Sequence, residues 1–376
     1  MQMGSIITDR LVARCLQKVA IMKIKLAILD REPDFLERLA SAFNARYWDK
    51  LEIYSFTQLD TALSELSEAR IDVFLADESF EIDLDKIPTR CGFAYFVENP
   101  QIASLRDQPA ISKYQKADSI YKQILSIYAE KSSDITGFKS DGTPSALISV
   151  FASPAGGVGS STLSAAYALT LARAGRRVLY MNLELFGRSD VFFTGAGQET
   201  LSDVIFVLKS QKLNLSVKLE SAVRESADGV FFFESPPIAL DVQELTQDDL
   251  ERLLRELRAR DRYDHIVLDM DFALDGRMLH ALKEAYAIVL VSDGMAIANT
   301  KLVRAYEALR MIDQQRDLRI LSKLYLVYNK FSNKVSQAVE GIELRLLGGA
   351  PRYAHASQRE VVEQLVSMNI FRQILR

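Results

Sequence analysis

The sequence predicts an α/β protein of two domains, each built on a mostly parallel sheet. Short apolar runs rich in β-branched residues alternate with amphipathic segments of helical length along most of the chain. A polar, glycine-containing stretch without periodicity, residues 130–144, divides the chain into two parts. The 376 residues are 48% hydrophobic and 26% charged, which is ordinary for a globular protein. Each part is therefore long enough to form its own core.

Before the first domain lies an extension, residues 1–22, that mixes charged with apolar positions. It lacks the uninterrupted apolar core of a signal peptide, and we expect it to pack on the first domain or remain poorly ordered, with a membrane-surface helix as the alternative. No apolar run approaches the length of about 18 residues that a membrane span requires, so we expect no transmembrane segment. The net charge of −4 argues against a nonspecific nucleic-acid surface. Two cysteines, Cys15 and Cys91, are too few for a disulfide framework and favour the cytoplasm.

The first domain, residues 23–129, alternates predicted strands with predicted helices. We expect strands at 24–29, 51–56, 71–76, 93–97 and 110–112, and helices at 33–45, 57–69 and 117–128. Pro33 suits the first turn of its helix. This order is typical of a flavodoxin-like parallel sheet, in which functional groups gather at the carboxyl ends of the strands.

Three polar residues lie at such strand ends: Asp30 after the first strand, Asp77 after the third and Lys113 after the fifth. They resemble the receiver domain of response regulators, which has an acidic Mg²⁺-binding pair, a phosphoacceptor aspartate and a lysine at these points. Arg31 stands where the second acid of the pair is expected, which leaves Asp30 with Glu32. Phosphorylating an aspartate needs a divalent cation to offset charge. The resemblance therefore implies an atypical receiver-like interaction domain, with phosphorylation of Asp77 as the alternative.

The second domain, residues 145–376, opens with a strand at 146–152, a glycine loop and a helix that runs to Ala174. The loop reads Ser153-Pro-Ala-Gly-Gly-Val-Gly-Ser-Ser-Thr162. Its three glycines let successive N–H groups point at phosphate oxygens, and the helix N-terminus adds partial positive charge. The residues expected to bind nucleotide phosphates are Ala155, Gly156, Gly157, Val158, Gly159, Ser160, Ser161 and Thr162. The Ser161 hydroxyl is also expected to bind Mg²⁺.

The loop resembles the deviant phosphate loop of the MinD/ParA ATPases, Lys-Gly-Gly-x-Gly-Lys-Ser/Thr. Ala155 stands at the signature lysine of that pattern and Ser160 at the loop lysine. The resemblance also matches Asn182 and Glu184 to two aspartates of the family, one of which helps to activate water. An amide cannot serve as a general base. The resemblance therefore implies ATP binding with little or no hydrolysis.

Further along the second domain the apolar pattern continues. We expect strands at 177–183, 229–234, 265–270, 287–292 and 324–328, and helices at 201–208, 247–260 and 299–309. The resemblance makes 187–197 a switch segment and Asp269 an Mg²⁺ residue opposite Ser161. Asn329 and Lys330 follow the last strand, and Pro351 lies in the next loop. By the same resemblance, Asn329, Lys330 and Pro351 form the adenine site.

A receiver-like flavodoxin-type domain followed by a MinD/ParA-like phosphate-loop domain resembles the TadZ/CpaE proteins of Flp/Tad pilus assembly. That resemblance implies a homodimer with ATP and Mg²⁺ as cofactors and pilus assembly components as partners. It also implies a cytoplasmic location at the cell pole, on the inner face of the membrane, and a scaffold function. One alternative is a cycling ATPase in which Lys330, an arginine or a partner protein supplies the missing cation. The other is a response regulator controlled through Asp77.

Overall fold

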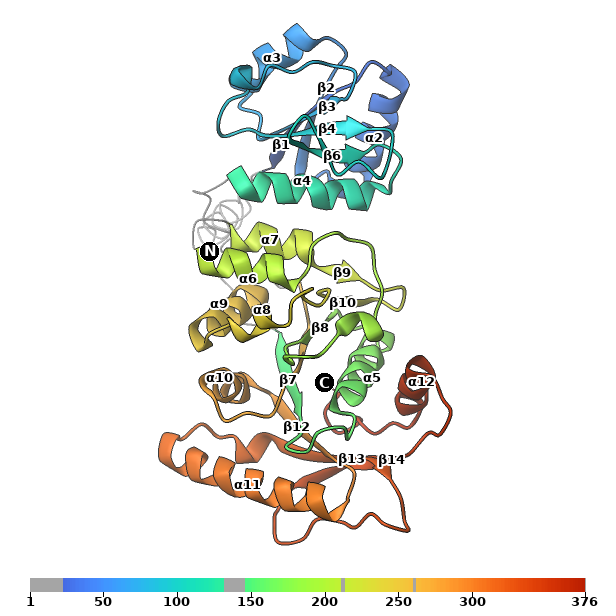
Figure 1. Cartoon of the computed structure of the whole chain (residues 1–376), viewed down its shortest axis with the longest axis vertical. Helices are drawn as coiled ribbons and strands as arrows, with labels where there is room; N and C mark the ends of the chain where they lie inside the picture. Colours follow the sequence, from blue (N-terminus) through green and yellow to red (C-terminus); the bar gives the residue numbers. More distant parts are fainter. Residues whose placement is uncertain (1–22, 132–145, 211–213, 260–261, 376) are drawn as a thin grey trace, which may run out of the picture. The chain divides into compact units, whose positions relative to one another are not determined.

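The computed structural model describes residues 23–131, 146–210, 214–259 and 262–375. The chain forms two compact units that divide between Ser133 and Asp134, within the predicted linker, and each is described by itself (Figure 1). The expected extension at 1–22 and residues 132–144 of the expected linker lie outside the described residues. No helix in the described ranges is long and apolar enough to cross a membrane.

The first unit contains a six-stranded sheet in the order β2-β1-β3-β4-β6-β5. Its strands are β1 (Ile24–Leu29), β2 (Leu51–Phe56), β3 (Val73–Asp77), β4 (Gly92–Val97), β5 (Ser104–Leu105) and β6 (Gln108–Ser112). Its helices are α2 (Pro33–Tyr47), α3 (Leu59–Glu68) and α4 (Ala117–Lys131). β5 pairs antiparallel with β6, while the other neighbouring strands pair in parallel. The predicted parallel α/β sheet is confirmed.

Neither connection beside β4 contains an α-helix, and the sequence predicted none there. A short 3-10 helix, Leu84–Lys86, joins β3 to β4, and β5 rather than a helix precedes β6. Between β5 and β6 the chain turns at Arg106 and Asp107, whose φ angles are 51° and 60°. Two central residues in this left-handed region form the two-residue turn that fits the twist of a hairpin. The hairpin therefore takes the place of a crossover helix.

The second unit contains an eight-stranded sheet in the order β14-β13-β12-β7-β11-β8-β10-β9. Its strands are β7 (Leu147–Ala152), β8 (Val178–Asn182), β9 (Arg224–Glu225), β10 (Val230–Phe232), β11 (His265–Asp269), β12 (Ala287–Ser292), β13 (Leu324–Phe331) and β14 (Arg345–Pro351). Its helices are α5 (Ser160–Arg173), α6 (Leu201–Ser210), α7 (Leu215–Ala222), α8 (Leu240–Gln243), α9 (Gln247–Arg258), α10 (Gly276–Glu284), α11 (Ala296–Arg316) and α12 (Gln358–Ser367). All pairs except that of β9 with β10 are parallel.

Alternate side chains of β7 enter two separate apolar clusters, one on each face of this sheet. Ile148 and Val150 belong to the cluster that includes α6, α9 and α10, whereas Phe151 belongs to the cluster that includes α5 and α12. This alternation is the period of two that a strand imposes. Helices therefore cover both faces (Figure 1). The glycine loop leaves the carboxyl end of β7 between these two layers.

Two sequence expectations about strand ends were wrong. Asn329 and Lys330, expected just after a strand, lie inside β13, and Pro351, expected in a loop, is the last residue of β14. The register between β13 and β14 shifts between Tyr328 and Phe331, and Lys330 has a φ of 57°. A bulge of this kind inserts residues without ending the ladder. It lets the pairing continue to the end of β14.

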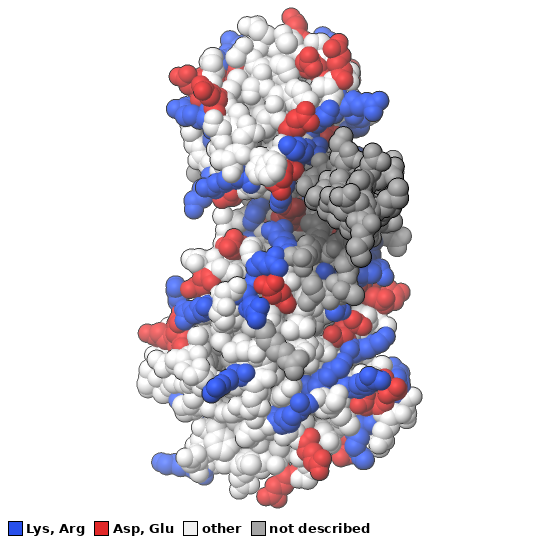
Figure 2. Space-filling model, turned by 180° about the vertical axis from the view of Figure 1, so that it is seen from behind, with Lys and Arg blue, Asp and Glu red and all other residues white. Residues whose placement is uncertain are grey.

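Basic and acidic side chains are interspersed on the face of the molecule shown in Figure 2. On α9, Arg255 lies 3.9 Å from Glu251 one turn earlier, and Arg258 lies 2.9 Å from Glu284 of α10. Ion pairs of this kind are typical of a solvated helix face. Two of the three arginines of α9 are thus paired with carboxylates, and the third, Arg252, donates to the Leu208 carbonyl at 3.2 Å.

Candidate functional site

The glycine loop joins β7 to α5, as predicted, and two of its glycines have left-handed backbone conformations. Gly157 has a φ of 76° and Gly159, at the N-cap of α5, a φ of 90°. A Cβ atom at Gly159 would lie 2.4 Å from the side-chain nitrogen of Asn329. Both the conformation and the available space therefore require glycine at this position. Ser160, Ser161 and Thr162 form the first turn of α5.

Asn329 and Lys330 of β13 hold this loop by two consecutive carbonyl groups. Asn329 Nδ2 donates to the Val158 carbonyl at 2.8 Å, and Lys330 Nζ donates to the Gly157 carbonyl at 2.7 Å. In a trans peptide the N–H points away from the C=O of the same unit. Fixing these carbonyls therefore turns the N–H groups of Val158 and Gly159 away from β13. The contacts pre-organise N–H donors, which is what an anion-binding loop requires.

The structure thus brings two of the three expected adenine residues, Asn329 and Lys330, to the phosphate loop. The Asn329 amide is buried. Pro351 is exposed and lies opposite Phe331 in the β13–β14 ladder. The adenine site remains a prediction. In it, the Asn329 side-chain oxygen would accept a hydrogen bond from the adenine ring while its nitrogen donates to the Val158 carbonyl.

A second group of polar residues lies at the carboxyl ends of β8 and β11. Asp269 ends β11 beside Asn182 of β8 and is fully buried. Its Oδ2 accepts hydrogen bonds from Tyr180 Oη and from Asn182 Nδ2, each at 2.9 Å. Its Oδ1 has no hydrogen-bond partner among the described residues. Nearby, Ser161 Oγ donates to Glu184 Oε2 at 2.7 Å.

These carboxylates are in an environment that disfavours their charge. Burial, and then the charge of Glu184, raises the pKa of Asp269 well above its ordinary value. Burial also raises the pKa of Glu184, with a smaller contribution from Asp271 and an opposing hydrogen bond from Ser161. A bound cation would remove this penalty.

The donors present here fit Mg²⁺. Ser161 and Asp269, the two predicted ligands, offer only oxygen atoms, and one oxygen of Asp269 is buried without a partner. Within the described ranges, no group of three or more His, Cys, Asp or Glu side chains could hold a metal. Mg²⁺ is usually bound through one or two carboxylates together with waters and substrate phosphates, so a sparse protein shell is what this ion requires.

The side-chain amide of Asn182 links Asp269 to the loop after β8 through hydrogen bonds, and an amide does not act as a base. Its nitrogen donates to Asp269, and its Oδ1 accepts the Glu184 backbone N–H at 3.1 Å. A Cβ atom at Gly187 would lie 2.1 Å from this oxygen, so the loop after β8 must pass close to the amide. Both ends of the Asn182 side chain are therefore used in holding its neighbours.

Sequence reasoning missed Tyr180 and did not connect Asp271 to the loop after β8. Tyr180 lies two residues before Asn182 on the same strand and therefore on the same face of the sheet. Asp271 Oδ2 accepts the backbone N–H of Leu185 at 2.7 Å, which joins the loop after β8 to the loop after β11. The alternation of side chains along a strand could have placed Tyr180 beside Asn182. The contact of Asp271 with Leu185 could not be predicted in this way, because it joins residues 86 positions apart.

In the first unit, the structure brings Asp30, Asp77 and Lys113 together. Lys113 Nζ lies 2.6 Å from Asp30 Oδ2 and also forms an ion pair with Asp77, and all three residues are buried. Glu32, the expected second acid, is exposed and donates its backbone N–H to Asp30 Oδ1 at 2.9 Å. The lysine ammonium therefore occupies the space between the two carboxylates.

Burial and pairing act in opposite directions on this cluster. Burial alone would raise the pKa of Asp77, but hydrogen bonds from Lys113 and Ser79 outweigh it, so the pKa is lowered. Burial would likewise lower the pKa of Lys113, yet the hydrogen bonds to Asp30 and Asp77 raise it. Both shifts stabilise the charged forms. At neutral pH the cluster is thus an ion pair network.

Comparison with known proteins gives a family model that matches the first unit and solved structures with a fold similar to that of the second. Residues 22–129 match the family model described as "TadZ-like, receiver domain". A ParA family ATPase from Chlorobium tepidum TLS is similar in structure, with a TM-score of 0.51 and 17% identity, over 62% of this chain and 99% of that one. The fold of the second domain is therefore that of a ParA family ATPase. The first domain belongs to the TadZ-like receiver domain family.

Two further solved structures are similar at lower TM-scores. The cell division ATPase MinD of Pyrococcus furiosus has a TM-score of 0.46 and 19% identity, over 61% of this chain and 99% of that one. The septum site-determining protein MinD of Pyrococcus horikoshii OT3 has a TM-score of 0.46 and 20% identity, over 61% of this chain and 91% of that one. Comparison with curated protein sequences gives no match.

Proposed function

We propose that this protein is a dimerising scaffold for Flp/Tad pilus assembly that binds Mg·ATP and hydrolyses it slowly or not at all. The TadZ-like receiver domain joined to a ParA-type fold supports the pilus connection. The observation that carries the proposal is the composition of the phosphate loop, which has Ala155 and Ser160 where the related pattern has lysines. The same resemblance supports a cytoplasmic location at the cell pole and pilus components as partners.

Binding relies on groups that remain in this site. Backbone N–H groups of the loop, oriented by Asn329 and Lys330, would hold the phosphates. Ser161 and Asp269 would hold Mg²⁺, which offsets phosphate charge when bound. Glu184 accepts a hydrogen bond from the Ser161 hydroxyl, which leaves the lone pairs of the Ser161 oxygen available for Mg²⁺.

Hydrolysis lacks two contributions. Positioned cations accelerate phosphoryl transfer by roughly 10³ to 10⁵, and neither Ala155 nor Ser160 can provide one. Asn182, at the position matched to a water-activating aspartate, donates its amide to Asp269 and cannot accept a proton. ATP would therefore act as a structural cofactor.

Analysis of retained nucleotide tests this proposal. The purified protein is denatured, the released nucleotide is identified by chromatography, and added Mg·ATP is followed for hours. We expect intact ATP and negligible phosphate release. Bound ADP with steady phosphate release would contradict the proposal and show that the protein is a cycling ATPase.

The position of Lys330 favours that cycling ATPase as the second candidate. Its ammonium lies 2.7 Å from the Gly157 carbonyl and thus next to the loop that lacks both lysines. If it neutralises phosphate charge during reaction, turnover should be measurable and should rise when the chain dimerises. Lys330→Met should then abolish turnover while Lys330→Arg retains part of it.

A further inference from the structure

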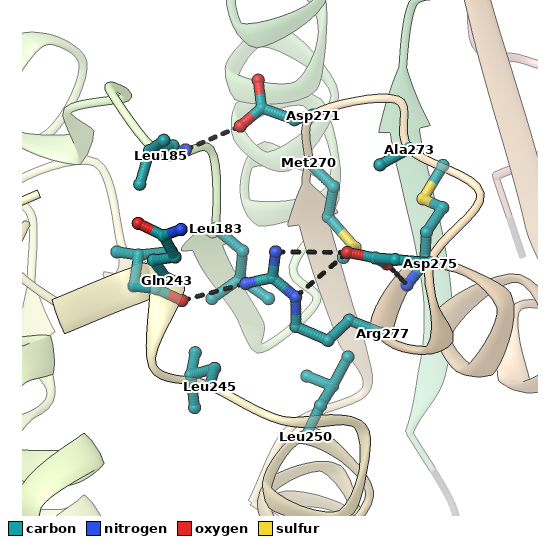
Figure 3. A pocket seen from close by; sticks show the side chains of 12 residues that line it. Leu183, Leu185, Gln243, Leu245, Leu250, Met270, Asp271, Ala273, Asp275 and Arg277 are labelled. Carbon is teal, nitrogen blue, oxygen red and sulfur yellow. Dashed lines mark hydrogen bonds and ion pairs between the residues drawn. The ribbon is translucent and has the colours of Figure 1, made fainter. Parts of the chain in front are cut away.

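A cavity of about 250 Å³ opens on the side of the second domain covered by α8, α9 and α10 (Figure 3). Its apolar lining includes Leu183, Leu245, Leu250 and Met270, which are all buried. Leu183 immediately precedes Glu184, and Met270 immediately follows Asp269. The cavity therefore shares two loops with the candidate metal site, although its other walls come from different helices.

Charged groups line the cavity beside this apolar part. Arg277 donates Nη1 to the Val242 carbonyl at 2.9 Å and lies 3.3 Å from Asp275 (Figure 3). Asp271 accepts the Leu185 N–H with one oxygen. The lining thus contains two carboxylates, Asp271 and Asp275, and one guanidinium, Arg277, so its charge balance is acidic.

Exposed apolar side chains lie next to the segments that form the walls. Phe186 follows the lining residue Leu185 and is 86% exposed, and Leu240, at the start of α8, is 63% exposed. Leu274, between the lining residues Ala273 and Asp275, is 40% exposed. Single exposed apolar residues are ordinary, but several around one apolar hollow are typical of an interaction site.

We propose that this cavity is the docking site for one apolar side chain, of leucine or isoleucine size, from a protein partner whose segment also carries Lys or Arg. The apolar lining suits a branched aliphatic side chain, and the exposed apolar residues beside the lining segments suit further apolar side chains of the same partner segment. The acidic balance of the lining complements a basic neighbour. The inference goes beyond the proposed function, because none of these walls belongs to the phosphate loop.

Docking at this cavity would reach the nucleotide site through the two shared loops. The Leu185–Asp271 hydrogen bond joins them, and they continue into Glu184 and Asp269. A side chain inserted between Leu185 and Met270 contacts both loops. The partner would therefore touch the segments that position the metal-side carboxylates.

Peptide selection on the full-length protein tests the proposal. A displayed library of random 12-residue peptides is selected, and the recovered peptides are synthesised and titrated by fluorescence anisotropy. Gln243 is exposed at the end of α8 and lines the cavity, so Gln243→Trp should cover the opening without disturbing the core. Met311→Trp, at a 58% exposed position on α11, is the matched control.

We expect recovered peptides to carry one Leu, Ile or Met with a neighbouring Lys or Arg. Their affinity should fall at least tenfold with Gln243→Trp, and with Ala273→Trp as a second block, but less than twofold with Met311→Trp. In a Gly159→Val background, which removes the nucleotide, Gln243→Trp should still abolish the peptide binding that remains, which separates this inference from nucleotide binding.

Two results would overturn the proposal. One is a peptide affinity that neither Gln243→Trp nor Ala273→Trp changes. The other is a change in the sedimentation of the protein alone on Gln243→Trp, because the cavity would then be covered by a second copy of this chain. Thermal unfolding of each variant confirms that a lost signal does not come from a lost fold.

Discussion

Gly159 is restricted both by its backbone and by its surroundings. Its φ of 90° is unfavourable for other residues, and a Cβ atom would meet Asn329 at 2.4 Å. Left-handed backbone costs a residue with a Cβ about 1–2 kcal/mol, and the clash would also push Asn329 off the Val158 carbonyl. We expect Gly159→Val to reduce retained nucleotide at least tenfold, measured per mole of protein after denaturation.

Gly156 provides the control for that experiment. A Cβ at Gly156 meets nothing within 4 Å, and its φ is not positive. Gly156→Ala should therefore keep its nucleotide. Equal retention by the Gly159 and Gly156 variants would contradict the assignment of this loop as the phosphate site.

Asp77 is expected to resist phosphorylation. Arg31 stands where a second acid would help to bind Mg²⁺, Glu32 is exposed, and the two remaining carboxylates, Asp30 and Asp77, are both paired with Lys113, so the cation that phosphorylation requires has few ligands. Incubation with acetyl phosphate and Mg²⁺ should give no acyl phosphate, assayed on a phosphate-affinity gel. A modified band that disappears in Asp77→Asn would establish the phosphoregulated alternative.

The same cluster predicts how the stability of the first domain depends on pH. Because the pKa of Asp77 is lowered in the folded state, the unfolded state binds more protons in acid, and stability should fall as the pH drops below about 4. Lys113→Met should destabilise the domain by about 3–5 kcal/mol at pH 7, since it leaves buried carboxylates unpaired. In that variant, mild acidification should increase stability, because protonation removes the buried charge.

Trp48 makes this measurement specific to one domain. It is the only tryptophan of the chain and lies at the C-cap of α2 in the first unit. Urea unfolding followed by its fluorescence between pH 3 and pH 7 therefore reports the first domain. Identical pH profiles for wild type and Lys113→Met would show that the ion pair network contributes nothing.

Among the elements, α12 and the residues that follow it are fastened to α5. Arg173 of α5 makes two hydrogen bonds of 2.7 Å to Glu363, and Gln358 donates to Thr162 Oγ1 at 2.6 Å. Phe371, just beyond α12, packs against Phe151 and Tyr167 in the core beside the phosphate-loop helix. The end of the chain thus supports α5 along its length.

Phe371→Ala should destabilise the second domain by about 3–5 kcal/mol, because it opens a cavity in a packed aromatic cluster. Arg372→Ala, at an exposed neighbouring position, should change stability by less than about 0.5 kcal/mol. Thermal unfolding followed by circular dichroism measures both variants. A small effect of Phe371→Ala would mean that the terminal segment is not part of this core.

Elements defined by local pattern were predictable from the sequence. β1 and β2 have the predicted bounds, because their apolar runs are short and clearly bordered. α12 was missed although Ser357 and Glu360 form a capping box that the sequence displays. α10 was missed in the same way, since Asp275 caps it by accepting the Met278 N–H.

The candidate site was predictable only in part, because its contacts join distant segments. The glycine loop follows from its position between a strand and a helix and from its glycine spacing, whereas Asp269 was predicted from the resemblance to the MinD/ParA ATPases. By contrast, the hydrogen bond from Asn329 to the Val158 carbonyl joins residues 171 positions apart. It also depends on a bulge in β13 that no local sequence pattern predicts. The use of Asn182 to bind Asp269 likewise depends on β8 lying beside β11. Such contacts are properties of the assembled sheet.

At the scale of the whole molecule, the proposed function requires that nucleotide and self-association depend on each other. A ligand that binds one assembly state more tightly shifts the equilibrium toward that state. If ATP is held at or near a dimer interface, the wild-type chain with Mg·ATP should sediment as a dimer. Gly159→Val should shift toward monomer at the same concentration, whereas Gly156→Ala should not. A Gly159→Val chain that has lost its nucleotide and still dimerises with unchanged affinity would place the interface elsewhere and leave ATP a role within one subunit.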